Sequence, residues 1–351
     1  MRLGHPPPLG KSMHLPHAAG ECEIHHRHAR GAPGSELGMM VYPTLLPSVH
    51  DMPIRHGPFH QTPMPRTISS ITFAAEDGFP LRGTLYAGTP DDGPVVLISS
   101  AAAVRRDHYG AFAEALVAAG ATAVLTYDYR GVGQSVVPPD WERRIDMKDW
   151  GAQDMAAAAS LLARLFPGRE LVGVGQSIGG TLIGLCPKHD LFRRYALVAS
   201  GNGWLGHTDE ALKLFLSMNI LALPVTWLTG RAPGWLGIGE TLPGSVFRDW
   251  ARWCRRRGFL FEDPGAARGF ETLETPLLFI GATDDPWSTA RATSAMQRYI
   301  PNAPREERWF SPAEVGATRI GHLGFFKEKF TTTLWPTAVD WLVKGKLAPM
   351  A

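Results

Sequence analysis

The chain has 351 residues, of which 44% are hydrophobic and 19% charged, and this composition excludes a fibrous or wholly disordered protein. Lys and Arg together number 35, against 33 Asp and Glu, so the formal net charge is only +2. A charge this small does not supply the basic field that collects nucleic acid, and we expect no nucleic-acid partner.

Residues 1–66 differ in composition from the rest of the chain. They hold 11 of the 29 prolines and nine of the 13 histidines, and no sustained helical or strand periodicity runs through them. Such a segment cannot bury enough apolar surface to offset the entropy of ordering its backbone, so the sequence predicts a disordered extension.

Cys22, His25, His26 and His28 are close enough to share a metal ion. A zinc site needs two spaced ligand pairs across a folded turn, so we interpret these residues as part of a histidine-rich tail and expect no metal or cofactor.

The chain shows no secretory signal, and no apolar run approaches the roughly 18 residues that a membrane span needs. Its three cysteines, Cys22, Cys186 and Cys254, are odd in number and widely separated, which is not the pattern of a disulfide framework. We therefore expect a cytoplasmic protein with no membrane partner. The sequence leaves the oligomeric state open.

From residue 67 onward, strand and helix patterns alternate. Residues 71–75 and 81–87 predict a hairpin around Asp77-Gly78, and the apolar run 95–99 predicts a buried parallel strand. Further strands are predicted over 123–127, 171–174, 195–199, 277–280 and 307–310, and helices over 109–119, 150–166, 178–185, 289–299 and 325–344. This order predicts one α/β domain over residues 67–351, with a mostly parallel, doubly wound sheet whose function sits at the carboxyl ends of the strands.

A segment at about 203–270 breaks this alternation, and we predict a helical insertion there, a cap over the sheet edge. Its apolar and aromatic residues include Trp204, Leu212, Leu214, Phe215, Leu216, Ile220, Leu221, Trp227, Trp235, Trp250 and Trp253. These side chains fit two interpretations: an apolar roof over an acyl pocket, or a small core of the insertion itself.

A candidate nucleophile follows the predicted strand 171–174. The run Gly175-Gln176-Ser177-Ile178-Gly179 matches G-x-S-x-G between a strand and a helix, where small neighbours let a serine occupy a strained, exposed turn. Neither the dinucleotide-binding spacing nor a phosphate-loop ending is present, so we expect Ser177 to be a catalytic serine.

A serine nucleophile needs a base that a third group orients. Outside the tail the histidines are His108, His189, His207 and His322, and only His322 follows the last predicted strand. We expect His322 to be the base. Asp284 follows the strand 277–280 and is the expected acid, with its neighbour Asp285 as the rival, because adjacent side chains point in different directions.

The order Ser177, Asp284, His322 and the run Asp128-Tyr129-Arg130-Gly131-Val132-Gly133-Gln134-Ser135 resemble the α/β-hydrolase superfamily, in particular its esterase and serine aminopeptidase-like members. The resemblance covers about residue 68 to the C-terminus. It implies an α/β-hydrolase fold in which the second run is a structural loop and Arg130 ties neighbouring loops together.

The same resemblance implies an oxyanion hole, which is a pair of N–H groups that bind the negatively charged oxygen of the reaction intermediate. One donor is the N–H of Ile178, directly after the nucleophile. The other comes from the loop after the strand 95–99, where many relatives carry His-Gly and this chain has Ser99-Ser100-Ala101-Ala102-Ala103. By register we expect Ala101 to be the second donor, with Ala102 as the alternative.

These residues predict a serine hydrolase that cleaves small-molecule carboxylic esters of small to medium acyl chain through an acyl-enzyme. The same groups would serve a serine peptidase, a thioesterase or an acyltransferase. A non-catalytic binding module on the same scaffold is a more remote alternative.

Overall fold

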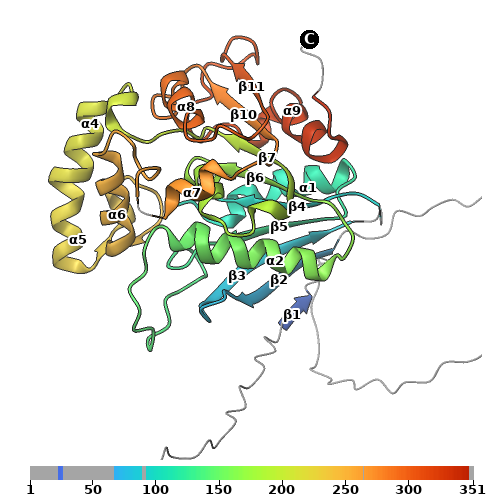
Figure 1. Cartoon of the computed structure of the whole chain (residues 1–351), viewed down its shortest axis with the longest axis horizontal. Coiled ribbons are helices and arrows are strands. Elements are labelled where there is room, and N and C mark those ends of the chain that lie inside the picture. Colours follow the sequence, from blue (N-terminus) through green and yellow to red (C-terminus); the bar gives the residue numbers. More distant parts are fainter. Residues whose placement is uncertain (1–22, 27–66, 89–91, 264, 348–351) are drawn as a thin grey trace, which may run out of the picture.

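A nine-stranded sheet forms the centre of the computed structural model, which describes residues 23–26, 67–88, 92–263 and 265–347 (Figure 1). The strand order is β1-β2-β3-β5-β4-β6-β7-β10-β11. The strands are β1 (Glu23–His26), β2 (Thr67–Ala74), β3 (Pro80–Ala87), β4 (Val95–Ser99), β5 (Ala123–Asp128), β6 (Leu171–Gln176), β7 (Phe192–Val198), β10 (Leu277–Ala282) and β11 (Arg305–Phe310). The last six are mutually parallel, and the first three pair in antiparallel fashion. The predicted mostly parallel sheet with an opening hairpin is confirmed.

The strand β1 lies within the segment for which the sequence predicts no regular structure. Its four residues pair with β2, so that prediction is wrong for Glu23–His26. The other residues of 1–66, including Cys22 and His28 of the candidate metal cluster, lie outside the described part of the chain.

Helices cover both faces of the sheet. On one face α1 (Gly110–Ala118) and α9 (Trp335–Val339) share a core with Val96 and Ile98 of β4. On the other face α2 (Ala156–Leu165), extended at its start by a π-helical turn, packs with Val95 and Leu97 of the same strand. Because successive residues of a strand point to opposite faces, a continuous apolar run such as β4 is what a strand buried on both sides requires. The short helix α8 (Ala290–Gln297) follows β10.

The C-terminal helix is shorter than predicted. It begins at Trp335, not near residue 325, and continues as a π-helical turn over Asp340–Lys344. Pro336 explains the late start, because proline has no N–H and fits an α-helix only in its first turn. The preceding residues contain a 3₁₀ turn over Glu328–Phe330.

The insertion between β7 and β10 is helical, as predicted, and adds a two-stranded sheet of its own. Its elements are η5 (Leu205–His207), α4 (Ala211–Phe215), η6 (Leu216–Ala222), α5 (Leu223–Thr229), β8 (Arg231–Ala232), η7 (Gly234–Leu236), β9 (Leu242–Pro243), α6 (Gly244–Cys254) and α7 (Ala266–Glu271). Figure 1 places α4 and α5 at the outer edge of the molecule, with α6 between them and the sheet.

The apolar residues of the insertion divide into two groups. Trp253 is buried in the core, and Leu214 and Trp250 pack against it, as the interpretation of a core predicts. Leu212, Leu216, Ile220 and Leu221 are exposed instead, so neither interpretation holds for them. They belong to a 19-residue helix, Ala211–Thr229, which contains an 18-residue window with a mean hydropathy of 1.6. By length and composition alone, this helix is long and apolar enough to cross a membrane. The expectation that no run approaches this length is therefore wrong.

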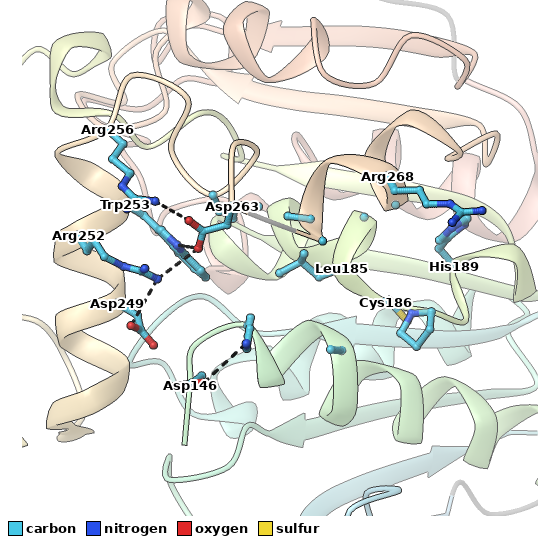
Figure 2. A pocket seen from close by; sticks show the side chains of 18 of the residues that line it. Asp146, Leu185, Cys186, His189, Asp249, Arg252, Trp253, Arg256, Asp263 and Arg268 are labelled. Atoms are coloured by element: carbon cyan, nitrogen blue, oxygen red, sulfur yellow. Dashed lines mark hydrogen bonds and ion pairs between the residues drawn. The ribbon is translucent and has the colours of Figure 1, made fainter. Parts of the chain in front are cut away.

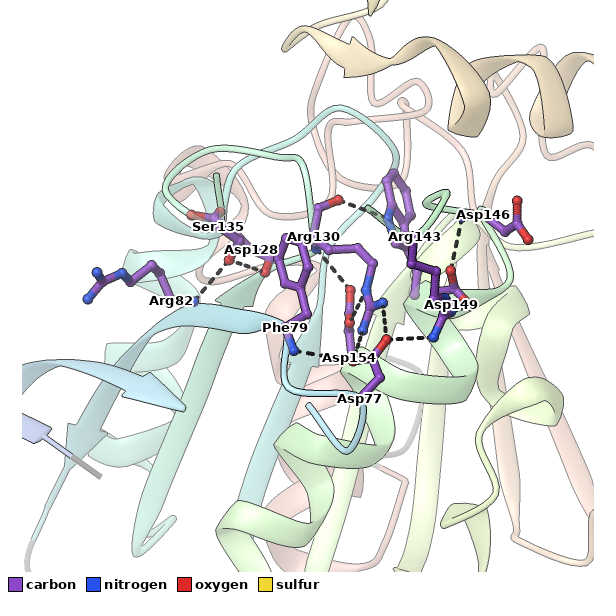
Figure 3. A network of polar contacts seen from close by, with 11 residues as sticks. Asp77, Phe79, Arg82, Asp128, Arg130, Ser135, Arg143, Asp146, Asp149 and Asp154 are labelled. Carbon is purple, nitrogen blue, oxygen red and sulfur yellow. Dashed lines mark hydrogen bonds and ion pairs between the residues drawn. The ribbon is translucent and has the colours of Figure 1, made fainter. Parts of the chain in front are cut away.

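A buried ion pair joins the loops at one end of the sheet (Figure 3). The fully buried Arg130 donates from Nε to Asp154 Oδ1 at 2.7 Å and from Nη1 to Asp77 Oδ2 at 2.7 Å, and its backbone N–H donates to Asp154 Oδ2 at 2.9 Å. Asp77 lies in the β2–β3 turn and Asp154 at the start of the α2 helix, so the prediction that Arg130 ties neighbouring loops together is confirmed. Burial raises the pKa of Asp154 to about 7, and Arg130 acts in the opposite direction.

We predict that Arg130→Met lowers the free energy of unfolding by about 3–5 kcal/mol, because it leaves Asp154 buried without its counter-charge. Arg143→Met is the matched control. Arg143 contacts the same Asp77, but its side chain is half exposed, and such pairs contribute about 1 kcal/mol or less. Urea denaturation measures both changes, and equal losses in the two variants would contradict the central role of Arg130.

Candidate active site

Ser177 occupies a strained turn between β6 and α3 (Ile178–Thr181). Its backbone angles are φ 54° and ψ −119°, a region that non-glycine residues rarely adopt. The flanking glycines make this turn possible. A Cβ on Gly175 would lie 2.3 Å from the carbonyl carbon of Gly179, and a Cβ on Gly179 would lie 2.3 Å from the carbonyl oxygen of Ser99. Gly175 therefore lets the turn close on the start of α3, and Gly179 lets α3 approach the end of β4.

His322 contacts Ser177, as the sequence predicts. Its Nε2 lies 2.9 Å from Ser177 Oγ, and its Nδ1 lies 2.8 Å from Asp285 Oδ2. A carboxylate accepts hydrogen bonds, so Nδ1 carries the proton and Nε2 is free to accept the serine proton. Three side chains from three separate loops thus form one line of hydrogen bonds.

Asp285, and not Asp284, is the acid that contacts His322. The Asp285 side chain is fully buried, and its Oδ1 accepts the backbone N–H groups of Trp287 at 2.9 Å and Ser288 at 3.1 Å. These two bonds hold one carboxylate oxygen within its own loop and leave Oδ2 directed at the histidine. The choice of Asp284 made from the sequence is corrected.

Asp284 faces a different part of the same site. Its two oxygens accept the backbone N–H groups of Ile320 and Gly321, each at 3.0 Å. Gly321 has φ 64°, a left-handed conformation that suits glycine. Asp284 therefore anchors the loop that carries His322, one residue away from the histidine itself.

The expected oxyanion donors have different surroundings. Ile178 is the first residue of α3, so its N–H has no acceptor within the helix and is available to a ligand. The N–H of Ala101 donates to Tyr109 Oη at 2.8 Å and is already occupied, which contradicts the choice made by register. Among the described residues the N–H of Ala102 has no acceptor, so the structure favours the alternative, Ala102.

Sequence reasoning missed two buried residues that connect these loops. Tyr109 Oη donates to Gln176 Oε1 at 2.7 Å, and Gln176 Nε2 donates to the carbonyl oxygen of His322 at 3.1 Å. Burial raises the pKa of Tyr109, so its hydroxyl stays protonated and serves as a donor. Gln176 is the variable position directly before the serine in the G-x-S-x-G run, and this position is the signal that identifies it.

The insertion attaches directly to the acid loop. Trp287 packs its ring beside that of His322, with 4.9 Å between the ring centroids, and its Nε1 donates to Glu210 Oε2 at 3.0 Å. The carbonyl oxygen of His207 accepts the hydroxyl of Thr289 at 2.7 Å. His207 therefore lies near this edge of the site, but His322 is the histidine that contacts Ser177.

A cavity of about 1010 Å³ lies away from these residues, between the insertion and the body of the domain (Figure 2). Its walls come from α6, α7 and the loops around residues 144–152 and 184–189, and they include none of Ser177, Asp285 or His322. Charged residues in these walls pair with one another: Asp263 forms ion pairs with Arg256 Nη1 at 2.6 Å and with Arg252 Nη2 at 3.2 Å. The cavity is thus separate from the serine site.

The part of the chain that the structure describes contains no group of three or more His, Cys, Asp or Glu side chains placed to hold a metal ion. Cys186 and Cys254 are buried free thiols, and burial raises the pKa of each to about 12. Neither thiol is therefore a nucleophile near neutral pH.

Comparison with known proteins identifies a family and a fold. A family model described as the alpha/beta hydrolase family matches residues 95–327. A soluble variant of monoglyceride lipase from Saccharomyces cerevisiae is 13% identical with a TM-score of 0.58, and the match covers 84% of this chain and 99% of that one. An esterase from Pyrococcus furiosus is 14% identical with a TM-score of 0.55, covering 84% and 97% of the two chains. The comparison with curated proteins gives no match.

We predict that the reactivity of Ser177 depends on Asp285 far more than on Asp284. Asp285→Asn should lower the rate of labelling by a fluorophosphonate about 10³–10⁴-fold, because an amide favours the wrong histidine tautomer. Asp284→Asn removes hydrogen bonds from the loop only, and we expect a loss of about tenfold or less. Gel fluorescence against time measures both rates, and a larger loss at position 284 would contradict the assignment.

Proposed function

Because the chain belongs to the alpha/beta hydrolase family, we propose that it is a serine hydrolase that cleaves carboxylic esters of small to medium acyl chain. The observation that carries the proposal is the line of hydrogen bonds from Ser177 through His322 to Asp285, at 2.9 and 2.8 Å. An oriented base at hydrogen-bond distance is what activates a serine hydroxyl at neutral pH.

In the proposed reaction Ser177 Oγ attacks the ester carbonyl carbon while His322 Nε2 takes the serine proton. The buried carboxylate of Asp285 stabilises the imidazolium ion that forms. Collapse of the intermediate releases the alcohol, which takes the proton from His322, and leaves an acyl group on Ser177. Water, deprotonated by His322, then attacks the acyl carbon, and the free acid leaves as Ser177 regains its proton.

The negative oxygen of each tetrahedral intermediate lies, in this proposal, at the N–H of Ile178 and of Ala102. Neither group has an acceptor among the residues that the structure describes, and an oxyanion hole requires such open donors. The small side chains of the loop after β4 leave the backbone accessible. Removal of one such donor typically costs about 10²–10³-fold in turnover, so this pair carries a large share of the rate.

Ester cleavage is our choice among the reactions that this site supports. Peptide, thioester and acyl-transfer substrates use the same nucleophile and base, and a binding module would not require the complete hydrogen-bonded line. No cofactor enters the proposed reaction. The cytoplasmic location stays a prediction from the sequence.

We predict that the protein hydrolyses p-nitrophenyl esters, with the highest kcat/KM at short to medium acyl chains. Ser177→Ala should lower kcat about 10⁶-fold, as loss of the nucleophile does in other serine hydrolases. Release of p-nitrophenolate with acetate, butyrate, octanoate and palmitate esters measures both.

Retained ester turnover in Ser177→Ala would contradict the proposed nucleophile. Fast release of amine from peptide p-nitroanilides, together with slow ester turnover, would identify a peptidase instead. Slow turnover of esters and rapid turnover of acyl thioesters would identify a thioesterase.

A further inference from the structure

The 19-residue helix Ala211–Thr229, here called the outer helix, is apolar on its exposed side. It is built from α4, η6 and α5, and only 17% of its most apolar 18-residue window is buried. Lys213 is its one charged residue. Helices of soluble domains normally turn their polar face outward, so an apolar outer face of this extent indicates an interaction surface.

The two sides of the outer helix follow its periodicity. Met218, Ala222 and Thr226, spaced four residues apart, are buried on the side that faces the domain. The opposite side carries exposed Leu212, Leu216, Ile220, Leu221, Trp227 and Leu228, and Leu228 is 86% exposed. Because its second half packs against α6 of the insertion, the outer helix cannot cross a bilayer without unfolding the insertion. It is placed to lie flat on an apolar phase.

Aromatic and basic residues border this apolar side. Trp227 and the neighbouring Trp235 are 72% and 75% exposed, and tryptophan rings favour the boundary between lipid and water. The guanidinium of Arg248 lies 4.3 Å from the Trp227 ring centroid, and Arg231 is exposed at the helix end. Arg255, which is also exposed, contacts Asn219 of the outer helix. These three arginines form no ion pair with any residue that the structure describes, and their positive charge therefore favours an anionic lipid surface. The same charge disfavours a symmetric pair of copies, which would bring it together.

The outer helix also begins close to the serine site. Glu210, the residue before it, accepts the indole N–H of Trp287 at 3.0 Å, and the Trp287 ring lies beside His322. A lipid surface under the outer helix would therefore lie near the catalytic histidine. An ester with an apolar chain could then reach Ser177 without crossing bulk water.

We propose that the outer helix docks the protein flat on an anionic lipid surface, from which the site draws apolar esters. The substrate part of this proposal rests on the proposed ester hydrolysis, whereas the docking part does not. This proposal replaces the expectation of a protein without a membrane partner, because the sequence did not show that the apolar side of the outer helix is exposed.

The test uses the full chain carrying Ser177→Ala, so that the vesicles stay intact. We expect this protein to sediment with vesicles of phosphatidylcholine and phosphatidylglycerol, and more weakly with phosphatidylcholine alone. Adding Leu221→Glu and Leu228→Glu should lower the partition coefficient at least about tenfold for each residue. Val136→Glu is the matched control, because Val136 is 68% exposed but lies on the loop after β5, and it should leave binding unchanged.

The melting temperature of each variant checks that the fold is intact. We expect it to be unchanged, because the substituted side chains are exposed. Three results would overturn the docking proposal: no sedimentation with anionic vesicles, undiminished sedimentation of the double Glu variant, or a dimer in light scattering that the double Glu variant dissociates. Equal binding to neutral vesicles would overturn the role of charge. If the Ser177→Ala chain binds vesicles but the chain with its native Ser177 hydrolyses no ester, the proposed hydrolysis is overturned and the docking proposal stays supported.

Discussion

The strained backbone of Ser177 is the constraint on which the site depends. A positive φ at a serine persists only where the surroundings determine it, and here the close approach of Gly175, Gly179 and the end of β4 does so. The turn directs Oγ toward the edge of the sheet where the parallel strands end. Since β4 and β6 are neighbours, the same contact brings the Ile178 N–H next to the loop that holds Ala102.

Around this turn, hydrogen bonds between loops hold the side chains of the site in position. Gln176 joins the serine turn to the His322 loop, and Asp284 fastens the start of that loop. Asp285 then orients the imidazole and, in the proposed reaction, stabilises its protonated form. In the proposed reaction Gln176 and Asp284 would therefore act only through the position of His322.

Much of this arrangement could be predicted from local sequence. The turn at Ser177, the choice of His322 and the alternation of strands and helices follow from short patterns whose physical causes are local. Which of Asp284 and Asp285 contacts His322 could not be predicted from the sequence. It depends on which of the two carboxylates accepts the backbone N–H of Trp287, and this is set by the conformation of the loop. The prediction of Ala101 as an oxyanion donor is wrong for a similar reason. Its N–H donates to Tyr109, which lies in the 3₁₀ turn that follows the loop. The exposure of the leucines on the outer helix could not be predicted, because composition alone does not reveal which side of a helix the domain covers.

If Ser177 is the nucleophile, its hydroxyl becomes acylated during ester turnover. The most direct test is to quench the reaction with p-nitrophenyl butyrate in acid during steady turnover and to map the modified peptide by mass spectrometry. We expect a butyryl group on Ser177 in the native protein and none on this residue in His322→Ala. A butyryl group on another residue, or product formation with unmodified Ser177 at every quench time, would contradict it.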